Sequence, residues 1–379
     1  MRYKVAILTQ PLGHNYGGML QAWALQQVLS NLGCEVITID RQPIRPSFVY
    51  VCARLAYRII MKVFSKRKTS IFIESKKSIA YQNTKKFIEL NLSVSESIYS
   101  TRQLKEHFDK NAYNAVVVGS DQTWRPRYSP CIENFYLDFL ETSNIKKIAY
   151  ATSFGVSNWE YDSELTNQCS KLAKLFDWIS VREDSGVTLC KQYFNLDVDQ
   201  VLDPTLLLNQ EDYKKLIGLD MLNAKNSGIY TYILDYSSEK TQLVESLSKQ
   251  YQEEIFCCQA KSSIEGSIDT DDMIMPDPRQ WLAGFANAKY VITDSFHGTV
   301  FSIIFNKPFI SISNSDRGAT RFRSLLKIFS LEDRLLTSLD EINHQLIIKP
   351  INYDLVNNLL EIERKKSVSY LTNVFSDGV

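Results

Sequence analysis

Short apolar runs rich in β-branched residues alternate with segments of helical period, and this alternation is what most constrains the fold. The first cycle consists of YKVAILT (3–9), MLQAWALQQVLSNLGC (19–34) and EVITID (35–40). Continuous apolar runs of this length are typical of strands buried on both faces of a parallel sheet. The sequence therefore predicts an α/β fold that starts with a strand, a helix and a second strand.

The pattern restarts once, which divides the chain into two halves. Strand-like runs of the first half continue at 113–121, 146–155, 177–183 and 198–204, and those of the second half lie at 228–236, 253–258, 289–295 and 307–312. Two such halves predict two Rossmann-like, doubly wound domains facing each other across a cleft. We predict an N-terminal domain over 1–210, to which part of a C-terminal helix (352–375) is added, and a C-terminal domain over 211–350.

Charge and cysteine content narrow the class of protein. Lysine plus arginine equals aspartate plus glutamate, at 43 each, which argues against a basic nucleic-acid binder. Seven cysteines without a CxxC pair are typical of reduced thiols in the cytoplasm. The N-terminal run reads as a strand rather than a signal, and no apolar run has the length of a bilayer span. We expect a cytoplasmic protein without nucleic-acid partners, and no spaced His/Cys/Asp set indicates a metal site.

The segment 45–77 departs from this even balance, with nine Lys/Arg against the single acid Glu74. Apolar residues recur in it at helical spacing beside a stripe of basic residues. One interpretation is an interfacial helix drawn to anionic headgroups at the inner face of the cell membrane. The other is a surface helix with a solvated basic face.

Polar clusters, most of them with a glycine, follow nearly every predicted strand. They are GHNYGG (13–18), GSDQTW (119–124), TSFG (152–155), VREDS (181–185), LDP (202–204) and TDSFHG (293–298). Ligands of open α/β sheets bind beyond the carboxyl ends of the strands. This distribution is typical of an enzyme.

Five segments in series resemble the polysaccharide pyruvyl transferase family. They are NYGGMLQAWALQ, VVVGSDQTW, ISVREDSG, VLDPTLLL and VITDSFHGTVFSIIFNKPFISI, and ATRFRSLLKIFSLEDRLL (319–336) is also similar. The resemblance covers residues 4 to 336. It implies a fold similar to the GT-B glycosyltransferases and the addition of phosphoenolpyruvate to a sugar diol, with release of phosphate and no further cofactor.

His297 is the candidate for proton transfer. Histidine is the side chain that ordinarily titrates near neutral pH, and the family's histidine matches this position. His297 follows a strand and opens a helix, whose first amide groups, with Gly298 and Thr299, suit a phosphate or carboxylate of the donor. The alternative is a histidine that merely caps the helix.

The donor carries two anionic groups, for which guanidinium groups are the natural partners. Arg182 matches the family's donor-binding arginine, although an ion pair with Glu183 or Asp184 is the alternative. Some members have an arginine where this chain has Ser295. We therefore expect Ser295 to lie at the donor site, with Arg317, Arg321 and Arg323 as the substitutes for that arginine; Arg321 and Arg323 can instead cover a helix face.

Two loops are predicted to bind the acceptor. The first supplies Asn15, Tyr16, Gly17 and Gly18, and the second supplies Ser120, Gln122 and Trp124, the last as an aromatic platform for a sugar. Asp121 is a candidate catalytic base or the cap of a turn. Asp203 is interpreted as a turn residue before a proline, and Asp294 either orients His297 or closes its strand.

The sequence thus predicts a pyruvyl transferase acting on a nucleotide-linked or lipid-linked saccharide precursor of a surface polysaccharide. Two other functions remain open. One is a GT-B-type glycosyltransferase with a nucleotide-sugar donor, which the helix start at Gly298 and Thr299 suits equally well. The other is a non-catalytic, saccharide-binding protein of an assembly complex.

Overall fold

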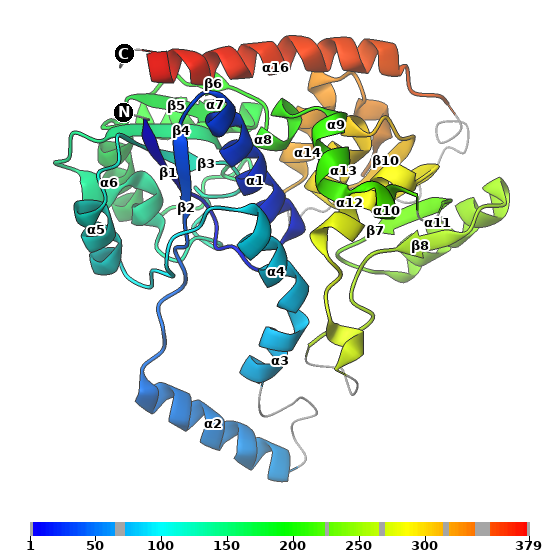
Figure 1. Ribbon diagram of the computed structural model, residues 1–379, viewed down its shortest axis with the longest axis horizontal. Coiled ribbons are helices and arrows are strands. Elements are labelled where there is room, and N and C mark those ends of the chain that lie inside the picture. The colour runs from blue at the N-terminus through cyan, green and yellow to red at the C-terminus, as the bar shows by residue number, and fades with distance from the viewer. Residues whose placement is uncertain are drawn as a thin grey trace.

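The computed structural model describes residues 3–64, 73–223, 227–264, 270–313, 318–337 and 349–376. Its N-terminal half is built on a six-stranded sheet in the order β2-β1-β3-β4-β5-β6 (Figure 1). The strands are β1 (Lys4–Leu8), β2 (Glu35–Ile39), β3 (Ala115–Gly119), β4 (Lys146–Thr152), β5 (Trp178–Val181) and β6 (Asp199–Gln200). Every strand pair in this sheet is parallel.

The C-terminal half is built on a second parallel sheet in the order β11-β10-β9-β7-β8. Its strands are β7 (Ile229–Tyr232), β8 (Ile255–Cys257), β9 (Tyr290–Thr293), β10 (Phe309–Ile312) and β11 (Leu335–Leu336). The prediction of two Rossmann-like, doubly wound sheets is therefore confirmed. The short β11 was not predicted, because two residues carry no detectable pattern. The predicted domain boundary, at 210 and 211, falls at the start of the helix α9 (Gln210–Ile217).

Helices cover both sheets. Those of the first half are α1 (Tyr16–Asn31), α2 (Phe48–Val63), α3 (Ile73–Ala80), α4 (Gln82–Asn91), α5 (Thr101–Lys110), α6 (Ser163–Ala173) and α7 (Asp184–Leu189). Those that follow are α8 (Pro204–Leu207), α9 (Gln210–Ile217), α10 (Leu219–Leu222), α11 (Ser238–Tyr251), α12 (Pro278–Asn287), α13 (Phe296–Ile304), α14 (Ala319–Ile328) and α16 (Tyr353–Ser376). Along α1 almost every side chain is buried, because it packs between the first sheet and the second half of the chain.

Both sheets reverse their strand order at one place. In the first sheet the reversal lies between β1 and β3, and in the second it lies between β7 and β9. The connections after these neighbouring strands run to opposite faces of the sheet, which leaves a crevice beyond their carboxyl ends where α/β proteins bind ligands. The loops after β1 and β3 contain Asn15 and Asp121, and the loop after β9 leads to His297.

The two halves are packed against each other through α1, α12 and α16. Tyr16 of α1 stacks on Trp281 of α12, with ring centroids 5.4 Å apart, and its hydroxyl donates to the carbonyl of Pro276 at 2.9 Å. The last helix, α16, runs along the top of the molecule over both halves (Figure 1). Near its start the hydroxyl of Tyr353 bonds the carbonyl of Lys307, and near its end Tyr370 packs edge-on against Trp178 at 5.5 Å.

The basic segment predicted at 45–77 forms α2 and the start of α3, while its residues 65–72 lie outside the described ranges. Figure 1 shows α2 apart from the body of the molecule, below α3 and α4. Among the described residues, no helix has the length and hydropathy needed to cross a bilayer.

Candidate active site

Loops from both halves of the chain bring a cluster of charged side chains together beyond the carboxyl ends of the strands. The cluster is formed by Asp121 after β3, Arg182 after β5, Asp203 after β6, His297 at the start of α13 and Arg321 on α14. All five side chains are buried. Ionisable groups gathered in the interior are typical of functional sites, because burial there is costly unless each charge has a partner.

Asp203 lies at the centre of this cluster and is completely buried. Its Oδ1 accepts hydrogen bonds from the Thr205 amide (3.0 Å) and hydroxyl (2.6 Å), which caps α8. Its Oδ2 accepts from Arg182 Nη1 at 2.7 Å and from Ser120 Oγ at 2.9 Å, and it lies 3.7 Å from His297 Nε2. Burial raises the pKa of this carboxyl, but the nearby imidazole and guanidinium outweigh it and lower the pKa well below its usual value.

Arg182 links three carboxylates. Besides Asp203, its Nη2 lies 3.8 Å from Asp121 Oδ1 and its Nε lies 3.9 Å from Glu183 Oε2. Burial lowers the pKa of this guanidinium, but Asp203, Asp121 and Glu183 together raise it above its ordinary value. Within the described part of the chain, its Nε and Nη2 have no hydrogen-bond partner. Two buried donors of a fixed cation are thus available to an anionic ligand.

Asp121 and Asn15 meet across the reversal point of the first sheet. Asn15 Nδ2 donates to Asp121 Oδ2 at 3.4 Å, so the loop after β1 is tied to the loop after β3. Asp121 has a left-handed backbone, with a φ of 63°. Aspartate is one of the few residues other than glycine that adopts this conformation at low cost. The conformation turns the carboxylate toward Arg182 rather than along the strand direction.

His297 lies against the first turn of α1. A Cβ atom added to Gly17 would stand 2.0 Å from His297 Nδ1, so only glycine at position 17 leaves room for the imidazole. The helix α13 that holds His297 begins at Ser295, whose hydroxyl accepts from the Gly298 amide at 3.4 Å. Among the described residues, His297 Nε2 is buried without a hydrogen-bond partner.

Arg321 and Arg182 share one aromatic neighbour, Phe296. The guanidinium carbon of Arg182 lies 4.3 Å from the ring centroid, and that of Arg321 lies 5.5 Å from it. Burial, together with the positive charge of Arg182, lowers the pKa of Arg321 to about 10. A bound anion beside these two cations would relieve that repulsion. The cavity among Arg182, Asp203, Phe296 and Arg321 measures only about 10 Å³, which holds no more than a single water.

Two further acids stabilise loops around the site. Glu183 Oε1 accepts from Ser153 Oγ (2.9 Å) and from the amides of Phe154 (2.9 Å) and Gly155 (3.2 Å), which fixes the loop after β4. Asp294 accepts from the amides of Leu234 (2.7 Å) and Asp235 (3.1 Å) and from Lys240 Nζ (2.7 Å). Of the two interpretations of Asp294, these contacts favour a structural one, in which Asp294 closes its strand and holds the loop after β7.

The acceptor prediction needs correction at Trp124 and Tyr16. Trp124 is completely buried, stacks on Tyr136 with centroids 4.8 Å apart, and donates from Nε1 to the Phe135 carbonyl at 3.0 Å. It is a core residue and offers no platform to a sugar. Tyr16 is also buried, and its ring and hydroxyl are used between the two halves as described above. The sequence could not reveal that these two residues are buried, because an aromatic residue in a polar loop can either bind a sugar or pack in the core.

Other predicted residues act on the protein itself. Ser120 is buried and donates to Asp203, and Gln122 Oε1 accepts from Arg125 Nη1 at 3.1 Å. A Cβ atom added to Gly18 would stand 3.2 Å from Asn15 Nδ2. Thr299, predicted to lie at the donor site, has a completely buried side chain that bonds Ser311 Oγ at 2.6 Å. Gly298 has a packing role, because a Cβ there would stand 2.2 Å from Thr293 Oγ1.

The arginine candidates separate into three groups. Arg321 faces the cluster, whereas Arg323 is exposed two positions further along α14, on the opposite side of the helix. The position of Arg323 therefore fits the alternative in which it covers a helix face. Arg317 lies outside the described residues.

The sequence analysis also missed the central part played by Asp203, because the LDP segment is typical of a simple turn.

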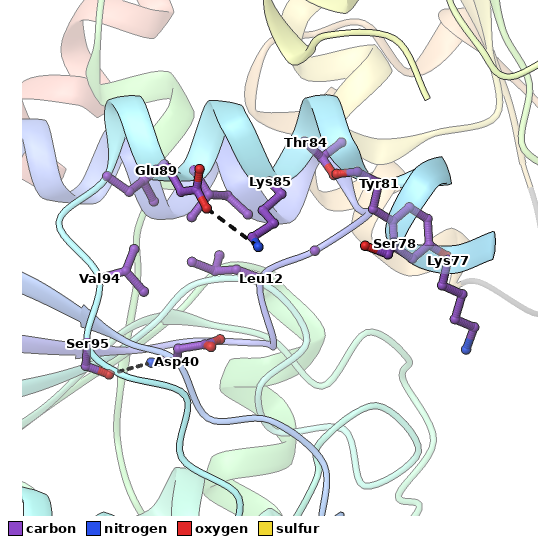
Figure 2. Close-up of a pocket in the computed structure, with 13 residues that line it drawn as sticks. Leu12, Asp40, Lys77, Ser78, Tyr81, Thr84, Lys85, Glu89, Val94 and Ser95 are labelled. Carbon is purple, nitrogen blue, oxygen red and sulfur yellow. Dashed lines mark hydrogen bonds and ion pairs between the residues drawn. The ribbon is translucent and has the colours of Figure 1, made fainter. Parts of the chain in front are cut away.

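A larger pocket of about 640 Å³ lies beside the loop that follows β1. Figure 2 shows Leu12 of that loop, Asp40 at the end of β2 and Val94 on one side, and Tyr81, Lys85 and Glu89 of the α4 region on the other. Lys85 and Glu89 form an ion pair at 3.8 Å. The lining combines apolar side chains with a few charged groups, which is typical of a small-molecule site.

Comparison with known proteins is consistent with this architecture. A family model described as polysaccharide pyruvyl transferase matches residues 15–316. No curated protein sequence matches the chain.

Solved structures are similar over almost the whole chain at very low sequence identity. The UDP-GlcNAc 2-epimerase from Neisseria meningitidis bound to UDP-GlcNAc is 10% identical, with a TM-score of 0.54, 99% of this chain covered and 100% of that one. Arabidopsis thaliana UGT89C1 complexed with quercetin is 9% identical, with a TM-score of 0.52, 98% of this chain covered and 99% of that one. These similarities confirm the GT-B-like, two-domain fold and carry no information on substrate.

Proposed function

The chain belongs to the polysaccharide pyruvyl transferase family, and from this membership we propose that it forms a pyruvate ketal on a saccharide precursor of a surface polysaccharide. The donor is phosphoenolpyruvate, and phosphate is released. The observation that carries the proposal is the buried cluster of Arg182, Asp203 and His297, in which two donor atoms of Arg182 and Nε2 of His297 remain available among the described residues.

Ketal formation needs one proton delivered to carbon and one leaving group that departs as phosphate. Protonation of the methylene carbon of phosphoenolpyruvate gives an oxocarbenium-like carbon, which one sugar hydroxyl attacks. The second hydroxyl then displaces phosphate and closes the ring. The two hydroxyl protons end on the new methyl group and on the phosphate, so atoms and charges balance without a cofactor.

His297 is the group we assign to proton transfer. Its Nε2 points toward the Asp203 carboxylate at 3.7 Å, close enough for the carboxylate to stabilise an imidazolium. Asp203 itself remains ionised, because the imidazole and Arg182 hold its pKa low. Gly17 fixes the imidazole from the other side through its lack of a side chain. Asp121, tied to the acceptor loop through Asn15, is the proposed base for the sugar hydroxyl.

Arg182 and Arg321 are the proposed donor clamp. Their guanidinium groups stand over the same Phe296 ring and repel each other in the free protein. The phosphate and carboxylate of the donor match two guanidinium groups in charge and in hydrogen-bonding geometry. Ser295, in the position of the arginine of other members, caps α13 and leaves Arg321 as the second cation.

The test is phosphate release from phosphoenolpyruvate by the purified protein, with and without galactoside acceptors. We expect acceptor-dependent release, a product heavier by one pyruvate ketal, and a loss of about a hundredfold or more in the His297→Ala variant. Arg321→Ala should lose activity while Arg323→Ala, on the exposed side of the same helix, should keep it. Equal activity in the two arginine variants would contradict the donor clamp.

A GT-B-type glycosyltransferase is the second candidate. Ser295 at the start of α13 favours it, because a helix start without the extra arginine also suits the diphosphate of a nucleotide sugar. The two donors separate the candidates: stabilisation of the fold against heat by a nucleoside diphosphate, but not by phosphoenolpyruvate, would favour the glycosyltransferase.

We further propose that the protein acts in the cytoplasm on a nucleotide-linked or lipid-linked acceptor, in contact with the inner face of the cell membrane through the segment 45–77. The basic composition of that segment supports the contact.

A further inference from the structure

Large apolar side chains are exposed on α2 and its flanks to a degree seen nowhere else among the described residues. Ten of the twenty exposed large apolar side chains lie between residues 44 and 64. They are Ile44, Phe48, Val49, Tyr50, Val51, Tyr57, Ile59, Ile60, Val63 and Phe64. Phe48 is 82% exposed and Val63 is 74% exposed. A contiguous apolar surface of this kind marks a place of contact with another molecule or with a membrane.

Charge on the same helix is arranged in one stripe. Arg54, Arg58 and Lys62 recur every four residues, so they lie above one another along the helix. Val63 follows Arg54 by nine positions, which brings it to the opposite side. No acidic residue occurs from 44 to 64. Arg58 is held by Glu74 of α3, with contacts of 2.8 and 3.1 Å, while Arg54 and Lys62 are exposed.

This pattern indicates what covers the helix. A purely apolar partner would cover the exposed cations Arg54 and Lys62 without supplying any negative charge beyond Glu74, which lies 3.7 Å from Arg54, and a second copy of the helix would bring like charges together. An anionic bilayer satisfies both faces, because it offers acyl chains to the apolar side and phosphate headgroups to the exposed Arg54 and Lys62. Tyr50 and Tyr57 flank the apolar side, at the depth that aromatic rings with a polar tip prefer.

The pocket beside the β1 loop is lined by residues that precede this helix in the chain and by residues that follow it. Asp40, which lines the pocket, precedes α2 by eight positions, and Lys77 and Ser78 of α3 line it from the other end. The pocket and the candidate active site share the loop that follows β1, because Gly13 lines the pocket and Gly17 lies against His297. Four peptide units separate these glycines, so their Cα atoms lie within about 15 Å of each other.

We propose that α2 docks on an anionic lipid bilayer and that the adjoining pocket receives a saccharide acceptor whose lipid carrier remains in that bilayer. The choice of acceptor class rests on the proposed function, whereas the docking does not. The apolar walls of Leu12, Tyr81 and Val94 suit the start of a carrier chain, and Lys85 suits its phosphate linkage.

Docking is tested by co-sedimentation of the full-length protein with phosphatidylglycerol–phosphatidylcholine vesicles. We expect binding that weakens with salt, that falls about tenfold or more in an Ile59→Ser/Ile60→Ser/Val63→Ser variant, and that falls similarly in an Arg54→Glu/Lys62→Glu variant. The matched control is Leu355→Ser/Ile362→Ser on α16, which removes equally exposed apolar side chains elsewhere. Equal binding by all four proteins, or no binding by any, would overturn the proposal. A dimer that the α2 variant cannot form would assign the helix to self-association instead.

The acceptor pocket is tested with phosphate release on a water-soluble galactoside and on a lipid-linked saccharide in the same vesicles. The α2 variants should keep the first activity and lose the second about tenfold. Lys85→Glu should lose the second activity without losing vesicle binding, whereas Lys86→Glu, outside the pocket on the same helix, should change neither. Equal activity of Lys85→Glu and Lys86→Glu on the lipid-linked acceptor would overturn the pocket assignment. Vesicle binding without phosphate release from any acceptor would refute the proposed function and leave the docking intact.

Discussion

Gly17 is the residue on which the position of His297 depends most directly. Its missing side chain lets the imidazole of one half of the molecule rest against a helix of the other half. The sequence analysis identified both residues but assigned Gly17 to the acceptor, because a glycine at a strand–helix turn does not reveal which neighbour needs the space. His297 and Arg182 were identified through their positions after strands together with the resemblance to the family, and Asp121 through its position after a strand. Asp203 was not, because its partners come from four different loops that only the folded chain brings together.

Gly17→Ala should lower kcat by about a hundredfold, since a Cβ at 2.0 Å from Nδ1 forces the imidazole of His297 to move. Gly13→Ala, assayed on the water-soluble galactoside because Gly13 lines the pocket proposed for the lipid-linked acceptor, is the matched control, since no atom lies within 4 Å of a Cβ at that position. Steady-state kinetics on the two variants check the prediction. Similar kcat values for both would mean that the position of His297 does not govern the reaction.

Asp203→Asn should lower the free energy of unfolding by about 3 kcal/mol at pH 7, because it leaves the buried Arg182 without its closest counter-charge. The native pKa of Asp203 is lowered, so its contribution to stability is present above the unfolded pKa of about 4 and is lost as the pH falls further. Urea unfolding between pH 7 and pH 3 should therefore show the difference between the two proteins shrinking below about pH 4. A difference independent of pH would exclude the ion pair as its cause.

At the scale of elements, the strands and most helices could be predicted because buried parallel strands carry continuous apolar runs. The helix that opens at His297 was predicted in this way; in the structure it is α13, and Ser295 caps its start. What the sequence could not give is the environment of α2. Its amphipathic period predicts a helix equally well on the body of the protein or away from it, and only the exposed fractions of its side chains distinguish the two.

Ser295→Ala should cost about 1 kcal/mol of stability, since it removes the hydroxyl that caps α13. The first turn of that helix holds His297, so kcat should fall as well. Ser295→Asp, which keeps a capping oxygen, should recover the stability. Thermal unfolding followed by circular dichroism measures the first effect, and a variant as stable as the natural protein would show that the cap contributes nothing.

At the scale of the whole molecule, the two-domain architecture could be predicted, whereas the closure of the site could not. The side chains assigned to catalysis are buried, and the cavity among them is about 10 Å³. Substrates far larger than a water must nevertheless reach them. Closure depends on contacts between residues hundreds of positions apart, such as Tyr16 with Trp281, which no local pattern encodes.

We therefore expect the two halves to separate and close during turnover. Small-angle X-ray scattering should give a radius of gyration near 21 Å for the closed form, and a value about 1 Å larger before substrates are added. Tyr16→Ala should favour the open form, because it removes the stacking on Trp281 and the bond to Pro276. An unchanged radius with and without substrates would contradict domain movement.

The path of α16 has a consequence for how the chain is made. Its final turns complete the core of the first half: Leu371 and Val374 are fully buried, Ser367 Oγ accepts from the Leu202 amide at 3.0 Å, and Phe375 packs on Tyr3 at 5.7 Å. The ribosome synthesises these residues after both sheets. The half of the protein that emerges first must therefore wait, with part of its apolar surface uncovered, until α16 has been made. The second half can finish its sheet earlier, so the order of folding is the reverse of the order of synthesis.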